Sequence, residues 1–180
     1  MEYYMYLSIP YKNFEIENLS FKRKRKKEKD FIKIVYSLNN VLINDIYIQT
    51  PIVKCNNIIK YHNTKIKNKY NVEFKCPTDF IDVLNNIEHK IQHYFENNIN
   101  NNNHISIINN NRININIFKD IYTGFTIYDL KDSESYYDID KLKENDNVKL
   151  LLAFNYIWIN NYNYGLSWRI IGIEYLSTDV

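Results

Sequence analysis

Alternating apolar and polar residues dominate the last part of the chain. Residues 147–176 hold two such runs, NVKLLLAFNYIWI and YGLSWRIIGIEYL, around the polar residues NNYN. A period of two is typical of β-strands, and two strands around a short polar turn predict an antiparallel hairpin over 147–176. The first run is apolar at both odd and even positions, so we expect it to be a central strand.

Shorter segments with the same period precede this hairpin. They read FIKIVYSL, NVLINDIYIQTPIVKC, KYNVEFK, HISII, RININIF and TGFTIYDL. Pro51 interrupts the second segment and predicts an edge or a bulge there. The asparagines between HISII and RININIF predict a second hairpin, because asparagine tolerates the positive φ of tight turns.

One segment has helical periodicity. Thr78 or Asp79 supplies an N-cap after Pro77, and apolar residues then recur every three or four positions from Phe80 to Ile91. The pattern predicts a helix over 79–96, followed by an asparagine-rich loop over 97–104. Eight or nine strands with one inserted helix favour a mainly β fold, an antiparallel barrel or sandwich formed by one domain over 1–180.

Composition excludes only a few classes of function. The chain has 17 tyrosines, three glycines and a net charge of +2, and its wealth of Asn, Ile, Lys and Tyr resembles the output of an AT-rich gene. Two cysteines, Cys55 and Cys76, are too few for a disulfide framework and fit a reducing compartment. Neither a signal peptide nor an apolar run of roughly 18 residues is present, so we expect an intracellular protein without membrane contact.

Enzyme motifs are missing. Three glycines cannot supply a phosphate loop or a dinucleotide fingerprint. His89 and His93 are spaced to hold a metal on a helix, but they lie off the apolar stripe and fit solvated surface residues better. The carboxylates that could form a nuclease-type metal cluster lie in a polar loop; they are Asp132, Glu134, Asp138 and Asp140. We therefore expect no catalysis, no metal and no cofactor.

A run of six cations favours nucleic acid as the partner. The run KRKRKK comprises Lys22, Arg23, Lys24, Arg25, Lys26 and Lys27. Between two strands it predicts a basic loop over 22–29 that follows phosphates; a nuclear import signal and a merely solvated loop are the alternatives. A second group mixes cations with a tyrosine, as single-stranded nucleic acid requires, and comprises Lys54, Lys60, Tyr61 and Lys65.

Two tryptophans lie near one end of the terminal hairpin. Trp158 and Trp168 flank the loop NNYNY and either plug the barrel or form a stacking platform. Arg169 follows Trp168 directly, so phosphate and base contacts are both available there. We take Tyr164, Trp168 and Arg169 as candidate nucleic-acid contacts.

Two segments of the sequence resemble a known family of proteins. IYIQTPIVKC with KYNVEFK and a helix, and later YGLSW before a last strand, resemble the single-stranded-DNA-binding proteins of large eukaryotic DNA viruses, which are similar to the T7-like phage OB-fold proteins. The resemblance covers roughly residues 41–176 and implies a mainly β fold, an OB-fold-like antiparallel barrel with one α-helix inserted between strands. It matches at Gln49, Thr50, Pro51 and the segment 164–168.

The resemblance implies non-enzymatic, sequence-independent binding of single-stranded DNA in replication, recombination and repair of a viral genome. It also implies a place in the host nucleus or at a cytoplasmic replication site, with replication proteins as further partners; a homodimer is compatible with it. The phage proteins carry an acidic C-terminal tail, whereas this chain ends in STDV, which puts partner binding through a tail in doubt.

A different class of function fits several of the same features. A β-sandwich virion or assembly protein would use the tyrosines for subunit contacts and would also tolerate asparagine-rich loops. Sedimentation separates the two hypotheses, because an assembly protein forms large species without nucleic acid.

Overall fold

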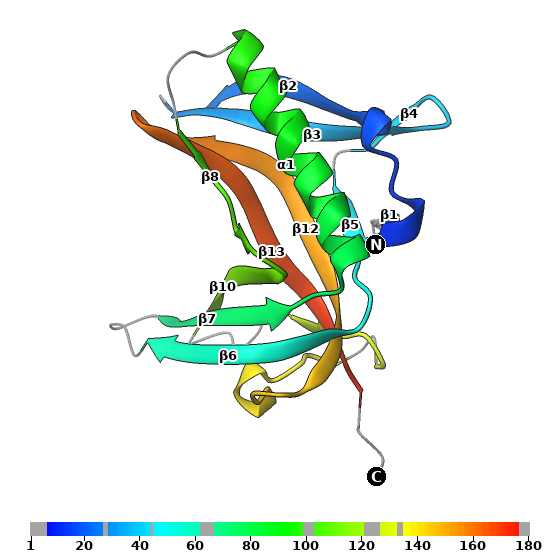
Figure 1. Ribbon diagram of the computed structural model, residues 1–180, viewed down its shortest axis with the longest axis vertical. Coiled ribbons are helices and arrows are strands. Elements are labelled where there is room, and N and C mark those ends of the chain that lie inside the picture. The colour runs from blue at the N-terminus through cyan, green and yellow to red at the C-terminus, as the bar shows by residue number, and fades with distance from the viewer. Residues whose placement is uncertain are drawn as a thin grey trace.

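The computed structural model describes residues 7–26, 29–43, 45–61, 67–98, 103–120, 127–132 and 135–176. These ranges hold one α-helix, three short 3-10 helices and a 13-stranded sheet (Figure 1). The helices are α1 (Thr78–Asn98), η1 (Tyr11–Asn13), η2 (Ile16–Asn18) and η3 (Ile139–Lys141). The strands are β1 (Leu7–Pro10), β2 (Leu19–Lys26), β3 (Lys29–Leu38), β4 (Val41–Ile43), β5 (Ile46–Gln49), β6 (Val53–Tyr61), β7 (Lys67–Lys75), β8 (Asn103–Ile105), β9 (Ile108–Asn109), β10 (Arg112–Asp120), β11 (Tyr128–Asp129), β12 (Asn147–Ile159) and β13 (Asn163–Leu176).

The predicted fold class is confirmed. The long strands pair antiparallel, in the order β10, β7, β6, β12, β13, and β10 then packs beside β13 without a ladder between them in the described residues. This cycle of five strands is a partly open barrel of the OB type. The one helix of the described chain, α1, follows β7, so it is inserted between barrel strands as the sequence predicts.

Strand β12 is central, as its two-sided apolar pattern predicts. One of its edges pairs with β13, and the other pairs in turn with β6, β5 and β3. The pairing with β13 contains two register shifts, at Leu151/Leu152 and at Phe154/Ile157. The shift at Phe154/Ile157 places one extra residue in β12 and so reverses its inward and outward positions. Strict alternation along β12 is therefore wrong: Ile157 is buried, and Trp158 is partly exposed.

Helix α1 extends one residue before and two residues beyond the predicted 79–96. Its apolar stripe is almost completely buried and comprises Phe80, Leu84, Ile87, Ile91 and Phe95. Asn97 and Asn98 continue the helix and Asn103 begins β8, so the predicted loop over 97–104 is too long; residues 99–102 lie outside the described residues. The helix lies across β2, β3 and β12 (Figure 1), and Tyr94 packs against Phe21 of β2 with ring centroids 4.9 Å apart.

The predicted basic loop over 22–29 is a strand for most of its length. Residues 22–26 belong to β2, and each pairs with a residue of β3 between Lys29 and Lys33. Residues 27 and 28 lie outside the described residues. In the described chain β2 pairs only with β3, and cations on such an edge oppose further strand addition. The basic run is therefore part of a sheet, whose register decides where each cation projects.

Candidate nucleic-acid interface

Paired residues place rings beside cations on one face of the part of the sheet formed by β2, β3 and the end of β12. Lys22 of β2 pairs with Lys33 of β3, and Lys33 pairs with Tyr156 of β12. Directly paired residues project to the same side of a sheet, so these three side chains form one row. Phe31 and Trp158 form the neighbouring row, two residues along each strand. The ring of Phe31 meets that of Tyr156 edge-on, with centroids 6.5 Å apart.

Strand β13 continues this surface. Trp158 pairs with Gly165, so residues two and four positions later, Ser167 and Arg169, project to the same side. Arg169 is exposed and Ser167 is half-buried. We call the surface formed by Lys22, Phe31, Lys33, Tyr156, Trp158 and Arg169 the aromatic–basic face.

The aromatic–basic face is accessible and its charge is uncompensated. It lies opposite α1, because Phe21 contacts the helix and Lys22, the next residue of β2, projects the other way. Within the described ranges, Lys22, Lys33 and Arg169 form no ion pair. Tyr156 is 39% exposed. Three cations and three rings share this face, and members of one row are separated by the spacing of neighbouring strands, about 5 Å.

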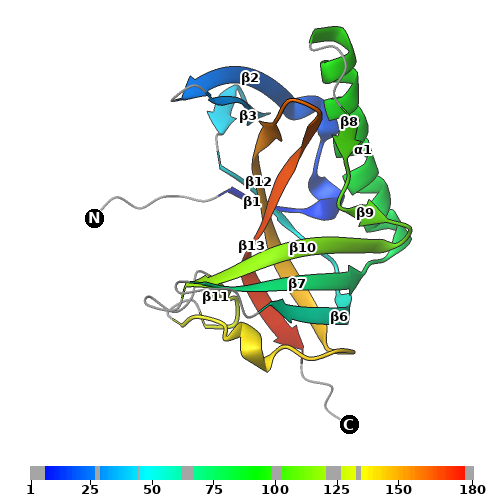
Figure 2. The same ribbon diagram turned by 90° about the vertical axis from the view of Figure 1, so that its left-hand side faces the viewer.

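A groove borders this face where β13 crosses β10. Figure 2 shows the two strands crossing steeply, and a groove of about 470 Å³ lies between them. Its lining combines apolar residues with the polar side chains of Asn114, Asn116, Ser167 and Arg169. Trp168 also lines it, and the indole nitrogen of this residue is buried without a hydrogen-bond acceptor in the described structure.

The outer surface of β6, β7 and β10 continues beyond the groove. Tyr61 pairs with Lys69, and the ammonium of Lys69 lies 5.6 Å from the centroid of the Tyr61 ring. Tyr61 is 46% exposed. Lys54 pairs with Lys75 at the other end of the same strands, and both are exposed. Two of the predicted contacts, Lys54 and Tyr61, therefore lie on this second surface.

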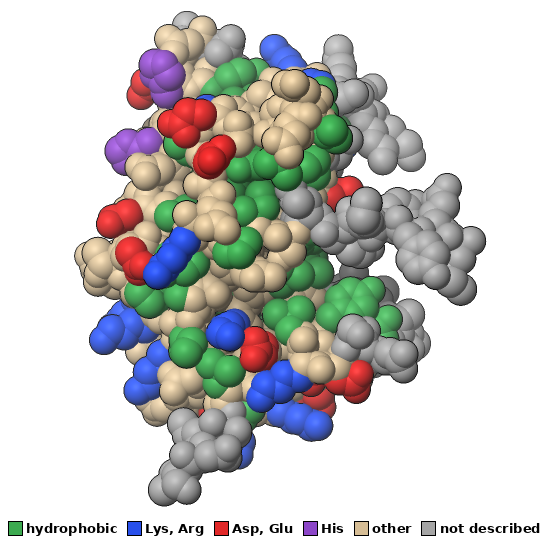
Figure 3. Space-filling model, turned by 90° about the vertical axis from the view of Figure 1, so that its right-hand side faces the viewer, with side chains coloured by type: hydrophobic (Ala, Val, Ile, Leu, Met, Phe, Trp, Pro, Cys, Tyr) green, Lys and Arg blue, Asp and Glu red, His purple; other side chains and the backbone are tan. Residues whose placement is uncertain are grey.

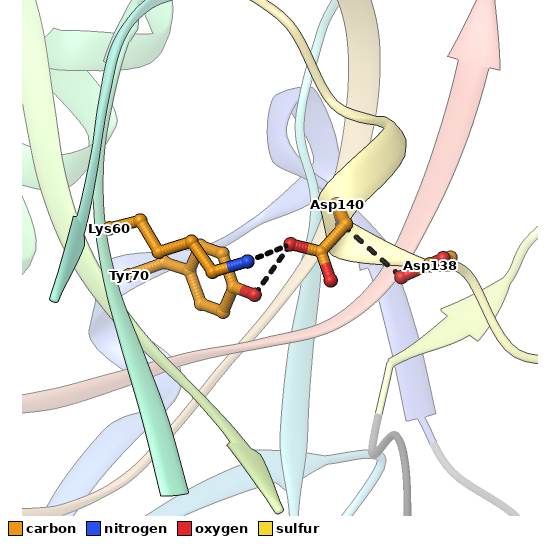
Figure 4. A network of polar contacts seen from close by, with 4 residues as sticks. All are labelled: Lys60, Tyr70, Asp138 and Asp140. Carbon is orange, nitrogen blue, oxygen red and sulfur yellow. Dashed lines mark hydrogen bonds and ion pairs between the residues drawn. The ribbon is translucent and has the colours of Figure 1, made fainter. Parts of the chain in front are cut away.

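Lys60 is already engaged by a carboxylate. Its ammonium donates to Oδ1 of Asp140 over 2.7 Å, and the hydroxyl of Tyr70 donates to the same oxygen over 2.7 Å (Figure 4). The hydrogen bond to Asp140 raises the pKa of Lys60. Asp138 caps the turn that presents this carboxylate, accepting from the backbone N–H of Asp140. Contact between Lys60 and phosphate, as the sequence predicts, would therefore require the ammonium to exchange Asp140 for the phosphate.

The aromatic candidates of the terminal hairpin are buried. Tyr164 is 5% exposed and stacks on Phe95 of α1, with ring centroids 3.8 Å apart. Trp168 is 7% exposed and packs against Phe154 at 4.9 Å. Neither is an exposed stacking surface, so the alternative that Trp168 plugs the barrel is the correct one. Gly165 lies inside β13, and Trp158 covers it.

The basic run divides between two faces. Lys22 lies on the aromatic–basic face, whereas Arg23 pairs with the buried Ile32 and so starts on the opposite side. The backbones of Lys24, Arg25 and Lys26 belong to β2, but their side chains are outside the described part of the structure. Lys27 and Lys65 lie outside the described residues altogether.

Sequence reasoning missed three members of the face, Phe31, Lys33 and Tyr156, and did not select Trp158. In the sequence, each of these residues is one of many in an alternating strand pattern, and nothing local distinguishes it from the others. Only the pairing of β3 with β12 brings them together, and strand pairing at a distance of more than 100 residues has no local pattern.

The residues considered for enzyme chemistry form no site in the described chain. His89 and His93 are exposed, and no group of three or more metal-ligating side chains gathers among the described residues; Glu134 lies outside them. Cys55 and Cys76 are buried free thiols, and burial raises the pKa of each to about 12. No helix in the described ranges has the length and apolar character that a membrane crossing requires.

No protein-family model matches the chain, and no curated protein matches its sequence. The assignment of function therefore depends on the geometry of the aromatic–basic face, the groove and the surface beyond it.

Proposed function

We propose that this protein binds single-stranded DNA without catalysing a reaction. The observation that carries the proposal is the pair of cross-strand rows in which Lys22 and Lys33 stand beside Tyr156, and Phe31 beside Trp158. A single strand presents phosphates and unstacked bases within reach of each other, and this face offers a partner for both.

The two kinds of contact contribute differently. Each base that stacks on an aromatic side chain contributes about 1–3 kcal/mol and tolerates any sequence. Each phosphate paired with a cation releases counterions, which makes the affinity fall as salt rises. Duplex DNA hides its bases from Tyr156 and Trp158, so we expect the protein to prefer the single strand.

The resemblance described above supports the same function. It extends the proposal to DNA replication, recombination and repair of a viral genome, within the host nucleus or at a cytoplasmic replication site. The strand order of a partly open barrel is compatible with this role, since OB barrels commonly hold oligonucleotides. The surface that we propose for the DNA strand differs from the usual binding surface of OB barrels, because the rings here lie on β3 and β12.

A titration of labelled oligonucleotide tests the proposal. Oligothymidylate of about 20 nucleotides covers the range of known OB-fold site sizes. Fluorescence anisotropy should show binding that weakens strongly between roughly 50 and 200 mM salt. A duplex of equal length should bind at least tenfold more weakly. Binding that ignores salt, or equal affinity for both forms, contradicts the proposal.

A second function, subunit contact in a virion or other assembly, has one observation in its favour. The β3–β4 hairpin turns at Asn39 and Asn40, which both have positive φ, and its tip exposes Leu38, Val41 and Leu42 by 37%, 61% and 52%. Figure 3, seen from the side on which β4 projects, shows hydrophobic side chains gathered in its upper half. Large species in sedimentation without DNA would favour this function.

A further inference from the structure

We infer that the groove between β10 and β13 takes one unstacked nucleobase of the bound strand and holds it by its polar edge. This inference rests on the proposed function and adds a base-binding site to it. A general stacking surface needs no such pocket.

The location of the groove is the first reason. Tyr156, Trp158 and Arg169 belong both to the aromatic–basic face and to the lining of the groove. On the other side, Asn116 pairs with Asn71 of β7 and so belongs to the outer surface that carries Tyr61. A strand that runs from one surface to the other therefore passes over the groove.

The lining of the groove suits a flat ring with a polar edge. Ile115 and Leu166 are buried and supply apolar contact. Asn114 and Ser167 supply hydrogen-bonding groups at the rim. The volume of about 470 Å³ is within the range of small-ligand sites, about 300–1,000 Å³.

Two polar atoms indicate that the ligand should carry acceptors. The side-chain oxygen of Asn116 accepts from the amide of Asn71 over 3.2 Å, which leaves the amide nitrogen of Asn116 to donate. The indole N–H of Trp168, a residue that is 7% exposed, has no acceptor in the described structure. Buried donors without partners are uncommon, and the carbonyl and ring-nitrogen acceptors of a nucleobase match both.

Photo-crosslinking locates the base. Oligothymidylate that contains 4-thiothymidine is irradiated on the full chain, and crosslinked peptides are mapped by mass spectrometry. Crosslinks to the groove residues Ile115, Leu166 or Trp168 support the inference. Crosslinks confined to Phe31 or Tyr61, which lie outside the groove, overturn it while leaving the proposed function in place.

Substitution of Asn116 tests whether its side-chain amide donates a hydrogen bond to the base. Asn116→Ala should weaken binding of oligothymidylate about three- to tenfold, the effect of one hydrogen bond. It should leave binding of a sugar–phosphate strand without bases unchanged. The control Asn57→Ala removes an exposed amide from β6, outside the groove, and should change neither.

The remaining outcomes separate the two proposals. If Asn116→Ala weakens both strands equally, the residue contacts the backbone and the base site is wrong. If the unsubstituted protein binds oligothymidylate and the base-free strand with the same affinity, the base site is also wrong, but DNA binding stands. If it binds neither strand, the proposed function fails and the base site with it.

Discussion

The indole ring of Trp158 lies directly over the backbone of its paired neighbour, Gly165. A Cβ atom at Gly165 would stand 2.7 Å from Cζ2 of Trp158 and 2.9 Å from the carbonyl oxygen of Ile105. The glycine thus lets the ring lie flat against β13 while β8 pairs with the other edge of that strand. This contact holds one ring of the aromatic–basic face in place.

Gly165→Ala should therefore destabilise the fold by about 1–3 kcal/mol, the usual cost of overpacking. The carbonyl of Ile105 is backbone and cannot move aside cheaply. Urea denaturation followed by circular dichroism gives the change in the free energy of unfolding. Gly172→Ala is the comparison: there the added carbon meets the side chain of Leu130, which is 38% exposed and can rotate away. Equal losses for both variants would show that the Trp158 contact is unimportant.

Lys33→Ala should reduce the salt dependence of DNA binding. Each phosphate contact contributes about 0.7 to the slope of log affinity against log salt for a single strand, so the variant should lose roughly that amount. Lys143→Ala, an exposed cation outside the face and the groove, should keep the slope of the unsubstituted protein. Anisotropy titrations at four salt concentrations measure it. An unchanged slope for Lys33→Ala would remove this residue from the interface.

Tryptophan fluorescence should report the stacking of bases on Trp158. The chain has two tryptophans, and Trp168 is packed in the core while Trp158 is partly exposed on the face. Oligothymidylate should quench the emission of the protein by stacking on Trp158. Trp158→Phe should abolish the quenching, whereas Trp168→Phe, checked for native circular dichroism, should retain it. The reverse result would place the stacked base on Trp168 and contradict the assignment of Trp158.

Cys55 and Cys76 should resist alkylation in the folded protein. Burial raises the pKa of each thiol to about 12, and the thiolate is the reactive form. At pH 8 the reactive fraction is about one in ten thousand, by the difference of roughly four pKa units. Iodoacetamide should therefore modify neither residue until denaturant is added, and mass spectrometry should then show two additions. Fast labelling of the native protein would show that the segments around these cysteines open readily.

Features that depend on residues close in sequence were predicted well, whereas features that depend on contacts between distant segments were not. Helix α1 and the 147–176 hairpin follow from local periodicity and caps, and both are confirmed within two residues. The basic run shows where such reasoning stops: six adjacent cations resemble a loop, but pairing with β3 makes residues 22–26 a strand. Tyr164 and Trp168 show a second limit, because an aromatic residue beside a turn has the same local pattern whether it is buried or exposed.

By itself, the sequence determined the kinds of element, their order and the buried stripe of α1, because each depends on neighbours a few positions apart. Tertiary structure alone decided which rings face solvent. The register shift at Phe154/Ile157 turns Trp158 outward, and the pairing of β3 with β12 sets Lys33 beside Tyr156. Asp140 likewise engages Lys60 across 80 positions of sequence. The physical reason is that a period of two defines two faces, whereas the partners across the sheet decide which face is covered.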